Sequence, residues 1–271
     1  MNRKTIIVTG GTGGIGLSLV KRLAQMDNKI FIIGKNEEKG KKAILETSSP
    51  GVEFFKCDLS EKKEINKFLK EINSVNKIDL LVNNAGALFL KREVNSENVE
   101  KNFSLNHISY FQMSLSLIEK LKKSNNPKII NITSNAHKMH SLDLEDLESK
   151  KNYSAWKAYC RSKLLNIYFT YEFNRKMNTN IICNCVHPGF VNSDFGNNNN
   201  SVYRAGIKII KKLFAISTDK SSSFIYNLCE DDLKNKSENY FYKGKEKKSS
   251  NISYDRKIAD FVWKESLKYI S

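Results

Sequence analysis

Short apolar runs alternate along the chain with longer amphipathic segments that carry lysines. Each run is a compact block of β-branched and aromatic residues without polar alternation, which is typical of parallel strands covered on both faces. The alternation of such runs with helical patterns predicts the α/β class, as a Rossmann-type, doubly wound parallel sheet between two helical layers in a three-layer αβα sandwich. The runs lie at residues 4–9, 29–33, 52–56, 78–82, 128–133 and 181–186, and a later one at 240–244 could extend the sheet at its edge.

A single domain accounts for residues 1–271. The chain contains no internal repeat and no linker rich in proline, glycine or serine, and a doubly wound sheet commonly fills this length alone. Residues 192–216, after the sixth predicted strand, have the pattern of a loop followed by a basic amphipathic helix. We expect this segment to form a lid, as is usual at this place in doubly wound folds.

The net charge of +16 requires an explanation in terms of partners. A basic surface favours nucleic acid, anionic membrane or an anionic cofactor. The lysines are spread along the whole chain, whereas a nucleic-acid groove needs them clustered. We therefore expect a compositional bias and no specific nucleic-acid partner. Weak peripheral contact of the lysine-rich stretch 234–248 with anionic lipid is an alternative.

Cysteine and histidine usage excludes several classes of protein. The five cysteines form no CxxC pair, which fits free thiols in a reducing compartment.

The N-terminus leads directly into a strand-like run, and no apolar run approaches the roughly 20 residues that span a bilayer, so we expect a cytoplasmic protein. His137 and His140 have the spacing of a metal pair, but no third ligand is placed to complete a site. We expect no metal.

A glycine-rich turn, TGGTGGIG, joins the first predicted strand to the helix that follows. Gly11, Gly13 and Gly16 fit the pattern GxGxxG, whereas Gly10, Gly14 and Gly16 fit TGxxxGxG. Such glycines let the backbone approach a pyrophosphate, whose charge is met by the helix N-terminus. The strand before and the helix after the turn favour a dinucleotide site over a purely structural turn. A Walker A loop is excluded because no Lys-Ser/Thr pair follows the last glycine.

The end of the second predicted strand indicates which dinucleotide is bound. NAD-selective folds usually place an acidic residue there to hold the ribose 2′-hydroxyl. This chain has Gly34 and Lys35 instead, which removes the acid and supplies a cation for a 2′-phosphate. We therefore expect NADP(H) to be preferred over NAD(H). Asp58, after the third predicted strand, is placed to bond the adenine, or alternatively to cap the helix that begins near Glu61.

Tyr159 and Lys163 are four residues apart, and so lie on one face of a predicted helix. A tyrosine phenol titrates near pH ~10, which is too high for acid–base work at neutrality. An ammonium one turn away stabilises the phenolate and lowers its pKa. Tyr159 could then exchange a proton with a carbonyl or alcohol oxygen. A YxxxK pattern alone is common by chance, and an ordinary exposed helix is the alternative.

The order of these motifs resembles the short-chain dehydrogenase/reductase family over about the first 230 residues. NNAG at 83–86 resembles the motif that braces the sheet beside the adenosine ribose. Asn106 matches the family's active-site asparagine, and Ser134 matches the serine that positions the substrate oxygen. PGFV at 188–191 resembles the segment that contacts the nicotinamide. The phrases NITSNAH and VHPGFVNSDF, and the acidic segment 143–147 between Ser134 and the tyrosine, are closest to the retinol-dehydrogenase-like branch.

The resemblance implies a catalytic tetrad with four distinct roles. Tyr159 is the general acid or base, and Lys163 lowers its pKa and holds the nicotinamide ribose. Ser134 bonds the substrate oxygen, and Asn106 anchors a water that relays protons to Lys163. The residues expected to contact the cofactor are Gly10, Thr12, Gly13, Gly14, Ile15, Gly16, Lys35, Asp58, Leu59, Asn84, Ala85, Gly86, Tyr159, Lys163, Pro188, Gly189, Val191 and Ser193.

We thus predict an NADP(H)-dependent oxidoreductase that moves a hydride between the nicotinamide and an apolar carbonyl or alcohol of retinoid, steroid or lipid-aldehyde type. The alternative is a catalytically weak dinucleotide-sensing or nucleic-acid-binding scaffold. Such a scaffold would be expected to have lost Tyr159 or Lys163, and this chain has both. The aromatic residues on the Tyr159 helix fit either plain core or the interface of a homodimer or homotetramer. They are Tyr168, Phe169, Tyr171 and Phe173.

Overall fold

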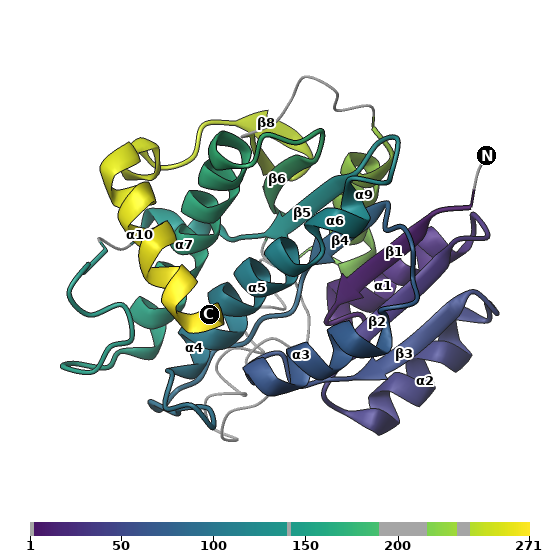
Figure 1. Ribbon diagram of the computed structural model, residues 1–271, viewed down its shortest axis with the longest axis horizontal. Helices are drawn as coiled ribbons and strands as arrows, with labels where there is room; N and C mark the ends of the chain where they lie inside the picture. Colours follow the sequence, from purple (N-terminus) through teal and green to yellow (C-terminus); the bar gives the residue numbers. More distant parts are fainter. Residues whose placement is uncertain (1–2, 140–141, 190–215, 232–238) are drawn as a thin grey trace.

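The computed structural model describes residues 3–139, 142–189, 216–231 and 239–271 (Figure 1). Eight strands form one sheet in the order β3-β2-β1-β4-β5-β6-β7-β8. The pairings are parallel except that of β7 with β8, which is antiparallel. The strands are β1 (Thr5–Thr9), β2 (Lys29–Gly34), β3 (Val52–Lys56), β4 (Leu80–Asn83), β5 (Lys128–Ile132), β6 (Ile182–His187), β7 (Tyr240–Tyr242) and β8 (Lys245–Lys247).

Helices and short helical turns connect the strands. The helices are α1 (Gly14–Ala24), α2 (Glu37–Thr47), α3 (Lys62–Glu71), α4 (Lys101–Phe103), α5 (Ser109–Ser116), α6 (Ile118–Leu121), α7 (Ala155–Lys176), α9 (Thr218–Glu230) and α10 (Arg256–Ile270). A π turn, η1 (Ser104–Ile108), and two 3₁₀ turns, η2 (Asn135–Lys138) and η3 (Asn251–Tyr254), complete the described elements. The doubly wound α/β fold predicted from the sequence is confirmed.

The sheet is buried on both faces because helices cover both, and successive strand residues point to opposite sides. On one side, Ile7 and Leu81 pack with side chains of α3, α5 and α7 in one hydrophobic cluster. On the other side, Val8 and Val82 pack with side chains of α1, α2 and α9 in a second cluster. Figure 1 shows these two groups of helices on opposite sides of the sheet. The apolar runs without polar alternation are therefore explained by two covered faces.

The aromatic residues of α7 belong to the core of this chain. Phe169 packs in a triangle of rings with Phe111 of α5 and Trp263 of α10, whose centroids lie 5.2 Å and 6.0 Å from its own. Of the two interpretations that the sequence left open, plain core therefore holds for these side chains. All four of the predicted aromatic residues are buried: Tyr168, Phe169, Tyr171 and Phe173.

The last hairpin was predicted only in part. The run at 240–244 forms β7 at 240–242, which pairs with β6, and the chain then turns back into β8. Lys243 and Gly244 have positive φ angles of 50° and 76°, as a tight hairpin turn requires at both central positions. The sequence did not reveal β8 because all three of its residues are charged and its turn lacks the usual Asn-Gly or Asp-Gly pair.

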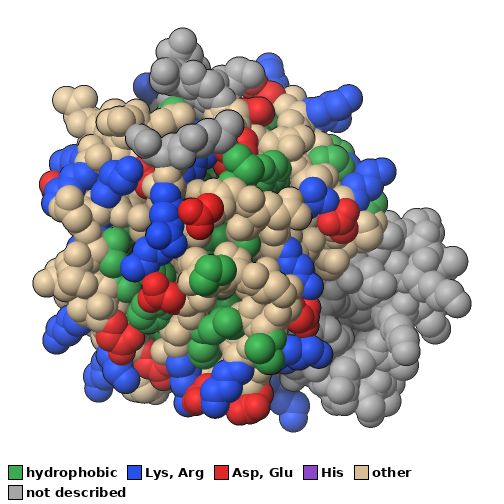
Figure 2. All heavy atoms as spheres, turned by 90° about the vertical axis from the view of Figure 1, so that its right-hand side faces the viewer, with side chains coloured by type: hydrophobic (Ala, Val, Ile, Leu, Met, Phe, Trp, Pro, Cys, Tyr) green, Lys and Arg blue, Asp and Glu red, His purple; other side chains and the backbone are tan. Residues whose placement is uncertain are grey.

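Lysines around α1, α2 and β3 lie close to acidic side chains. Lys21 Nζ is 2.7 Å from Glu46, and Lys41 Nζ is 3.1 Å from Glu37. Figure 2 shows this side of the molecule, where basic and acidic side chains are interspersed rather than gathered into one basic groove. Among helices in the described ranges, none combines the length and apolarity needed to cross a bilayer. The five cysteines are buried and free of disulfides.

Candidate active site

The turn between β1 and α1 needs glycines because parts of its backbone lie too close together to admit side chains. Gly10 and Gly14 have φ angles of +65° and +55°, in the left-handed region that favours glycine. A Cβ on Gly16 would lie 2.3 Å from the main-chain oxygen of Gly10, so no larger residue fits there. Among the described residues, a Cβ on Gly13 would have no neighbour within 4 Å. The backbone therefore requires the glycines of the TGxxxGxG pattern, whereas Gly13 faces open space within the part of the chain that the structure describes.

The N-terminus of α1 is suited to an anion. Its N-cap residue is Gly13, which has no side chain to accept a hydrogen bond, and the first turn contains no acidic residue. The N–H groups of a first helical turn lack acceptors within the helix and carry the positive end of its dipole. The open space beside Gly13 and these N–H groups fit the pyrophosphate of a dinucleotide. Ile15 packs against the core, so this part of the site is formed by backbone.

Asn84 holds the glycine turn against the end of β4. Its side-chain Nδ2 donates to the main-chain oxygens of Thr9 and Gly10, at 2.9 Å and 3.3 Å. The Thr9 hydroxyl in turn accepts from the main-chain N–H groups of Asn84 and Ala85, at 2.8 Å and 3.0 Å. This double connection explains why the NNAG segment follows β4. A Cβ on Gly86 would lie 3.4 Å from Lys163 Nζ, so this small residue lets the NNAG segment approach α7.

Lys35 and Asp58, predicted for two different parts of the cofactor, lie beside each other. Gly34 pairs with Lys56 where β2 and β3 end, so the residues that follow them are neighbours. Lys35 Nζ is 3.9 Å from Asp58 Oδ2, and its side chain is 70% exposed. A Cβ on Gly34 would lie 2.9 Å from Thr12 Cγ2, so Thr12 lies against the end of β2.

Asp58 does not cap the following helix, so that alternative interpretation is wrong. Helix α3 begins at Lys62, and its N-cap is Glu61. Asp58 Oδ1 instead accepts from the backbone N–H and the hydroxyl of Ser60, at 3.0 Å and 2.7 Å, which closes a tight turn. The side chain of Leu59 is buried in the core, which leaves its backbone as the part able to face a cofactor.

Tyr159, Lys163 and Ser134 converge at the carboxyl end of β5. Tyr159 and Lys163 lie on α7, and Lys163 Nζ is 5.7 Å from the centroid of the Tyr159 ring. The same ammonium is 5.4 Å from the Tyr110 ring and donates to the main-chain oxygen of Ile132 at 3.2 Å. Ser134 follows β5 and is hydrogen-bonded to Tyr159 through its side chain. Three of the predicted tetrad residues thus lie together.

Burial dominates the electrostatics of the tyrosine and the lysine. It raises the pKa of Tyr159 above its ordinary value, while the hydrogen bond with Ser134 lowers this pKa. Burial also lowers the pKa of Lys163 to about 7. The prediction that Lys163 holds this pKa below its ordinary value is therefore wrong for this structure, because burial outweighs the other effects. Tyr159 is protonated near neutral pH, the form that gives a proton to a carbonyl oxygen. Lys163 is close to its own titration midpoint.

Asn106 lies in the π turn η1 and connects the loop after β4 to α7. Its Oδ1 accepts from Ala87 N at 2.9 Å. Its Nδ2 donates to Ala87 O at 2.9 Å and to Ser162 Oγ at 3.2 Å, so both amide hydrogens bond within the protein. Its main-chain oxygen accepts from Asn166 Nδ2 at 2.8 Å. A relay water at Asn106 would therefore have to donate to one of the residue's oxygens.

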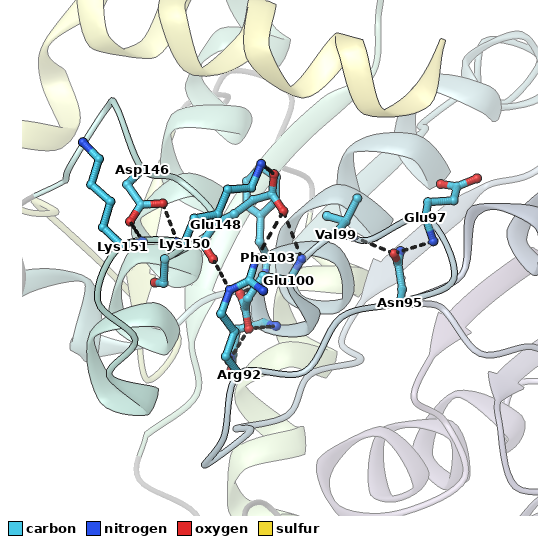
Figure 3. Close-up of polar contacts among 12 residues, drawn as sticks. Arg92, Asn95, Glu97, Val99, Glu100, Phe103, Asp146, Glu148, Lys150 and Lys151 are labelled. Atoms are coloured by element: carbon cyan, nitrogen blue, oxygen red, sulfur yellow. Dashed lines mark hydrogen bonds and ion pairs between the residues drawn. The ribbon is translucent and has the colours of Figure 1, made fainter.

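The acidic loop between Ser134 and α7 is fixed by a buried network that sequence reasoning missed. Glu148 accepts from the Tyr269 hydroxyl at 2.9 Å and from Glu100 N at 3.2 Å. Asp146 accepts from Lys150 N and Lys151 N, at 2.6 Å and 3.0 Å. Figure 3 shows Glu148 of this loop beside Arg92 and Glu100 of the segment after β4. This anchoring fixes the chain that leads into α7 and Tyr159.

The predicted segment after β6 is described only at its beginning. Val191, Ser193 and the predicted lid 192–216 lie outside the described residues, apart from Ile216. Pro188 O accepts from the Ser221 hydroxyl at 3.1 Å, which ties this segment to α9. Gly189 has a φ of +104°, and a Cβ there would lie 2.6 Å from Ile216 Cδ1. A glycine is therefore required at the turn that leaves β6.

Comparison with known proteins identifies the family. The sequence model of the short chain dehydrogenase family matches residues 4–204. Over 277 residues the chain is 31% identical to polyprenol dehydrogenase of Homo sapiens, with 97% of this chain and 84% of the relative covered. Over 197 residues it is 34% identical to retinol dehydrogenase 11 of Homo sapiens, with 70% and 62% covered.

Solved structures agree with this assignment at the level of the fold. An uncharacterized protein from Mycobacterium Paratuberculosis superposes with a TM-score of 0.81 at 22% identity, with 98% of this chain and 93% of that chain covered. An actinorhodin polyketide ketoreductase with NADPH superposes with a TM-score of 0.70 at 20% identity, with 89% and 95% covered.

The chain belongs to the short-chain dehydrogenase family. It lies close to the retinol-dehydrogenase-like branch, as its motifs predicted. It is an oxidoreductase that acts on CH–OH or C=O groups, and its family binds NAD(P)(H).

Proposed function

We propose that this chain transfers a hydride between the nicotinamide of NADP(H) and an apolar carbonyl or alcohol substrate. The observation that carries the proposal is the convergence of Ser134, Tyr159 and Lys163 at the end of β5. This cluster lies close to the glycine turn. Asn84 ties that turn to the end of β4, and Gly86, two residues after Asn84, approaches Lys163.

Each residue of the cluster has a role that its chemistry allows. When bound, the dinucleotide supplies the hydride to a carbonyl carbon or accepts it from an alcohol. In the reducing direction, the Tyr159 hydroxyl donates its proton to the carbonyl oxygen, and the Ser134 hydroxyl holds the same oxygen. The Lys163 ammonium stabilises the phenolate that remains, and in this proposal it also bonds the nicotinamide ribose. Oxidation of an alcohol uses the same groups in reverse.

The preference for NADP(H) is supported by the end of β2. Gly34 leaves no carboxylate there to repel a 2′-phosphate, and the Lys35 ammonium is largely exposed. Its distance of 3.9 Å from Asp58 is long for an ion pair, so a phosphate oxygen can compete for it. The glycine turn, Asn84 and the exposed Lys35 would together hold the dinucleotide.

An apolar substrate is supported by the surroundings of Tyr159. Its ring packs in a small cluster with Leu88 and Ala136. The indole of Trp156 stacks on the phenol with ring centroids 5.8 Å apart, and Trp156 is 48% exposed. The names of the relatives, polyprenol and retinol dehydrogenases, denote isoprenoid alcohols. We therefore place this chain's substrate among isoprenoid or related lipid alcohols and aldehydes.

We retain several further predictions from the sequence as part of this proposal. Residues 1–271 form one catalytic domain, and the segment 192–216 closes over the substrate to exclude water during hydride transfer. A cytoplasmic location, weak peripheral contact of the basic stretch 234–248 with anionic lipid, and assembly as a homodimer or homotetramer remain predictions. The alternative of a sensing or nucleic-acid-binding scaffold gains no support from the described residues or from the comparisons.

A coupled test of cofactor and substrate addresses the proposal. Purified protein is incubated with NADPH or NADH and with either retinal or pyruvate, and absorbance at the nicotinamide band is followed. We expect retinal to be reduced with NADPH and pyruvate to be left unchanged. A Tyr159→Phe variant serves as the control for contaminating reductases. Turnover of pyruvate alone, or an equal rate with both dinucleotides, would contradict the proposed substrate class or cofactor preference, respectively.

A further inference from the structure

His137 is a fully buried imidazole in the turn η2, three residues after Ser134. Both of its ring nitrogens have partners. Nδ1 lies 2.7 Å from the main-chain oxygen of Ser134, and Nε2 lies 3.1 Å from the main-chain nitrogen of Ser250. The imidazole therefore connects the active-site serine to the segment that follows β8.

The two partners define the protonation of the ring. The Ser134 carbonyl can only accept a hydrogen bond, so Nδ1 must carry the hydrogen. The Ser250 N–H can only donate, so Nε2 must be the acceptor. His137 is thus a neutral imidazole in the Nδ1–H form. Burial, and to a smaller extent the charge of Lys138, lower its pKa to about 4, whereas the bond to Ser134 acts in the opposite direction.

Ser134 is held at both its carbonyl and its hydroxyl. Its main-chain oxygen accepts from the backbone N–H of His137 at 3.1 Å in addition to the ring. Its hydroxyl accepts from Ala136 N at 3.2 Å and is bonded to Tyr159. The direction of the carbonyl fixes the backbone from which the hydroxyl projects. A small rotation at the carbonyl would move the hydroxyl away from Tyr159, and catalytic geometry tolerates only about 10–20° of such error.

The other end of the bridge returns to α7, the helix that carries Tyr159. Ser249, next to Ser250, bonds through its hydroxyl to the Tyr171 hydroxyl at 2.9 Å. The Tyr168 hydroxyl donates to Ile252 O at 2.7 Å. Both tyrosines lie on α7. The chain of contacts from Ser134 through His137 and Ser250 thus ends on the helix of the catalytic tyrosine.

We propose that His137 is a positioning residue for the reaction. Its Nδ1–H orients Ser134, and its Nε2 fixes the ring to the segment 249–254, which is hydrogen-bonded to α7. The inference rests on the proposed function, in which the Ser134 hydroxyl holds the substrate oxygen. The two ring nitrogens have different roles, since only Nδ1 contacts the serine. Nε2 acts on the stability of the C-terminal segment.

Two substitutions separate these roles. In His137→Asn, the amide nitrogen takes the place of Nδ1 and can still donate to Ser134, but the acceptor for Ser250 is lost. In His137→Gln, the amide oxygen can take the place of Nε2 and accept from Ser250, but the donor to Ser134 is lost. Kinetics with an apolar aldehyde give kcat and KM, fluorescence titration gives the Kd of NADPH, and thermal unfolding gives the Tm of each variant.

We expect His137→Gln to lose about tenfold in kcat, the loss of one oriented hydrogen bond, with the Kd of NADPH unchanged. His137→Asn should keep kcat within about threefold of the parent while its Tm falls at least as far as that of His137→Gln. Equal losses of kcat in the two variants, or losses that follow Tm rather than the nitrogen removed, would overturn the proposal.

Ring protonation provides a test that does not depend on turnover. In ¹⁵N NMR of histidine-labelled protein, the resonances that disappear in His137→Asn identify the ring, and we expect the Nδ1–H form. An Nε2–H form, or a charged ring at neutral pH, would overturn the positioning role even in an active enzyme. A parent protein that shows the Nδ1–H form but turns over no carbonyl would instead refute the proposed function.

Discussion

The ammonium of Lys163 lies 5.7 Å from the centroid of the Tyr159 ring and donates a 3.2 Å hydrogen bond to Ile132 O. The lysine is therefore bound to the end of β5 and lies beside the phenol ring. Its burial is nearly complete, and this burial lowers its pKa to about 7. A group shifted in this way makes the stability of the folded chain depend on pH.

The first prediction concerns this pH dependence. An unfolded chain holds the Lys163 proton up to pH ~10.4, whereas the folded chain releases it near pH 7. Between these values the unfolded state binds more protons, so the contribution of Lys163 to the free energy of unfolding rises with pH. Relative to Lys163→Met, the parent should gain stability from pH 7 to pH 9 and show a constant difference below pH 6. Urea unfolding without dinucleotide measures this, and a difference independent of pH would contradict it.

The second prediction concerns the indole beside the phenol. Trp156 stacks on Tyr159 and remains partly exposed, as expected for the wall of an apolar pocket. Trp156→Ala should raise KM for retinal about tenfold or more through lost apolar contact, and change KM for a small ketone much less. Phe261→Ala, at a 36% exposed position on α10, is the control. Equal effects on both substrates would show that Trp156 does not select the substrate.

The third prediction concerns the glycine turn. In Gly16→Ala the new methyl group would lie 2.3 Å from Gly10 O, so the turn must shift, at a cost of about 1–3 kcal/mol in stability. NADPH binding should weaken as well. Gly13→Ala is the control for folding, because no atom of the described ranges lies within 4 Å of its Cβ position and its φ of −171° suits any residue. Thermal unfolding of the two variants should therefore differ, and equal Tm values would be inconsistent with this geometry.

The fourth prediction concerns cofactor preference. Lys35→Ala should weaken NADPH binding by about 1–3 kcal/mol, the value of a charge-assisted hydrogen bond, and leave NADH binding unchanged. Lys42→Ala removes another exposed lysine, on α2, and should affect neither dinucleotide. Fluorescence titrations at one fixed salt concentration compare the three proteins. A parallel loss for NADPH and NADH in Lys35→Ala would mean that its ammonium does not contact the 2′-phosphate.

Much of the fold could be predicted because its signals are local. The predicted run at 29–33 becomes β2, one residue longer, and the run at 52–56 coincides with β3. The glycine turn lies where its sequence predicted, between β1 and α1. β8 was missed because its residues are charged and exposed, so no apolar pattern identified it.

The site was predictable where motifs are short and local, as for Tyr159 and Lys163 one turn apart. Glu148 was missed because its partner Tyr269 is 121 residues away, and a glutamate in a charged loop is usually solvated. His137 was considered only as half of a metal pair, because its contact with Ser250 is made only in the folded chain. Long-range partners of buried polar groups leave no periodic signal in the sequence.

The fifth prediction tests the central claim, that Tyr159 is the proton donor of the reaction. Tyr159→Phe removes the hydroxyl that bonds Ser134 and keeps the ring against Trp156 and Lys163. Rates of carbonyl reduction at saturating NADPH, with the Kd of NADPH measured in parallel, separate proton transfer from cofactor binding. We predict a loss of ~10²–10⁴ in kcat, the usual contribution of general acid–base catalysis, with Kd nearly unchanged. A variant that reduces the carbonyl at close to the parent rate would contradict the mechanism.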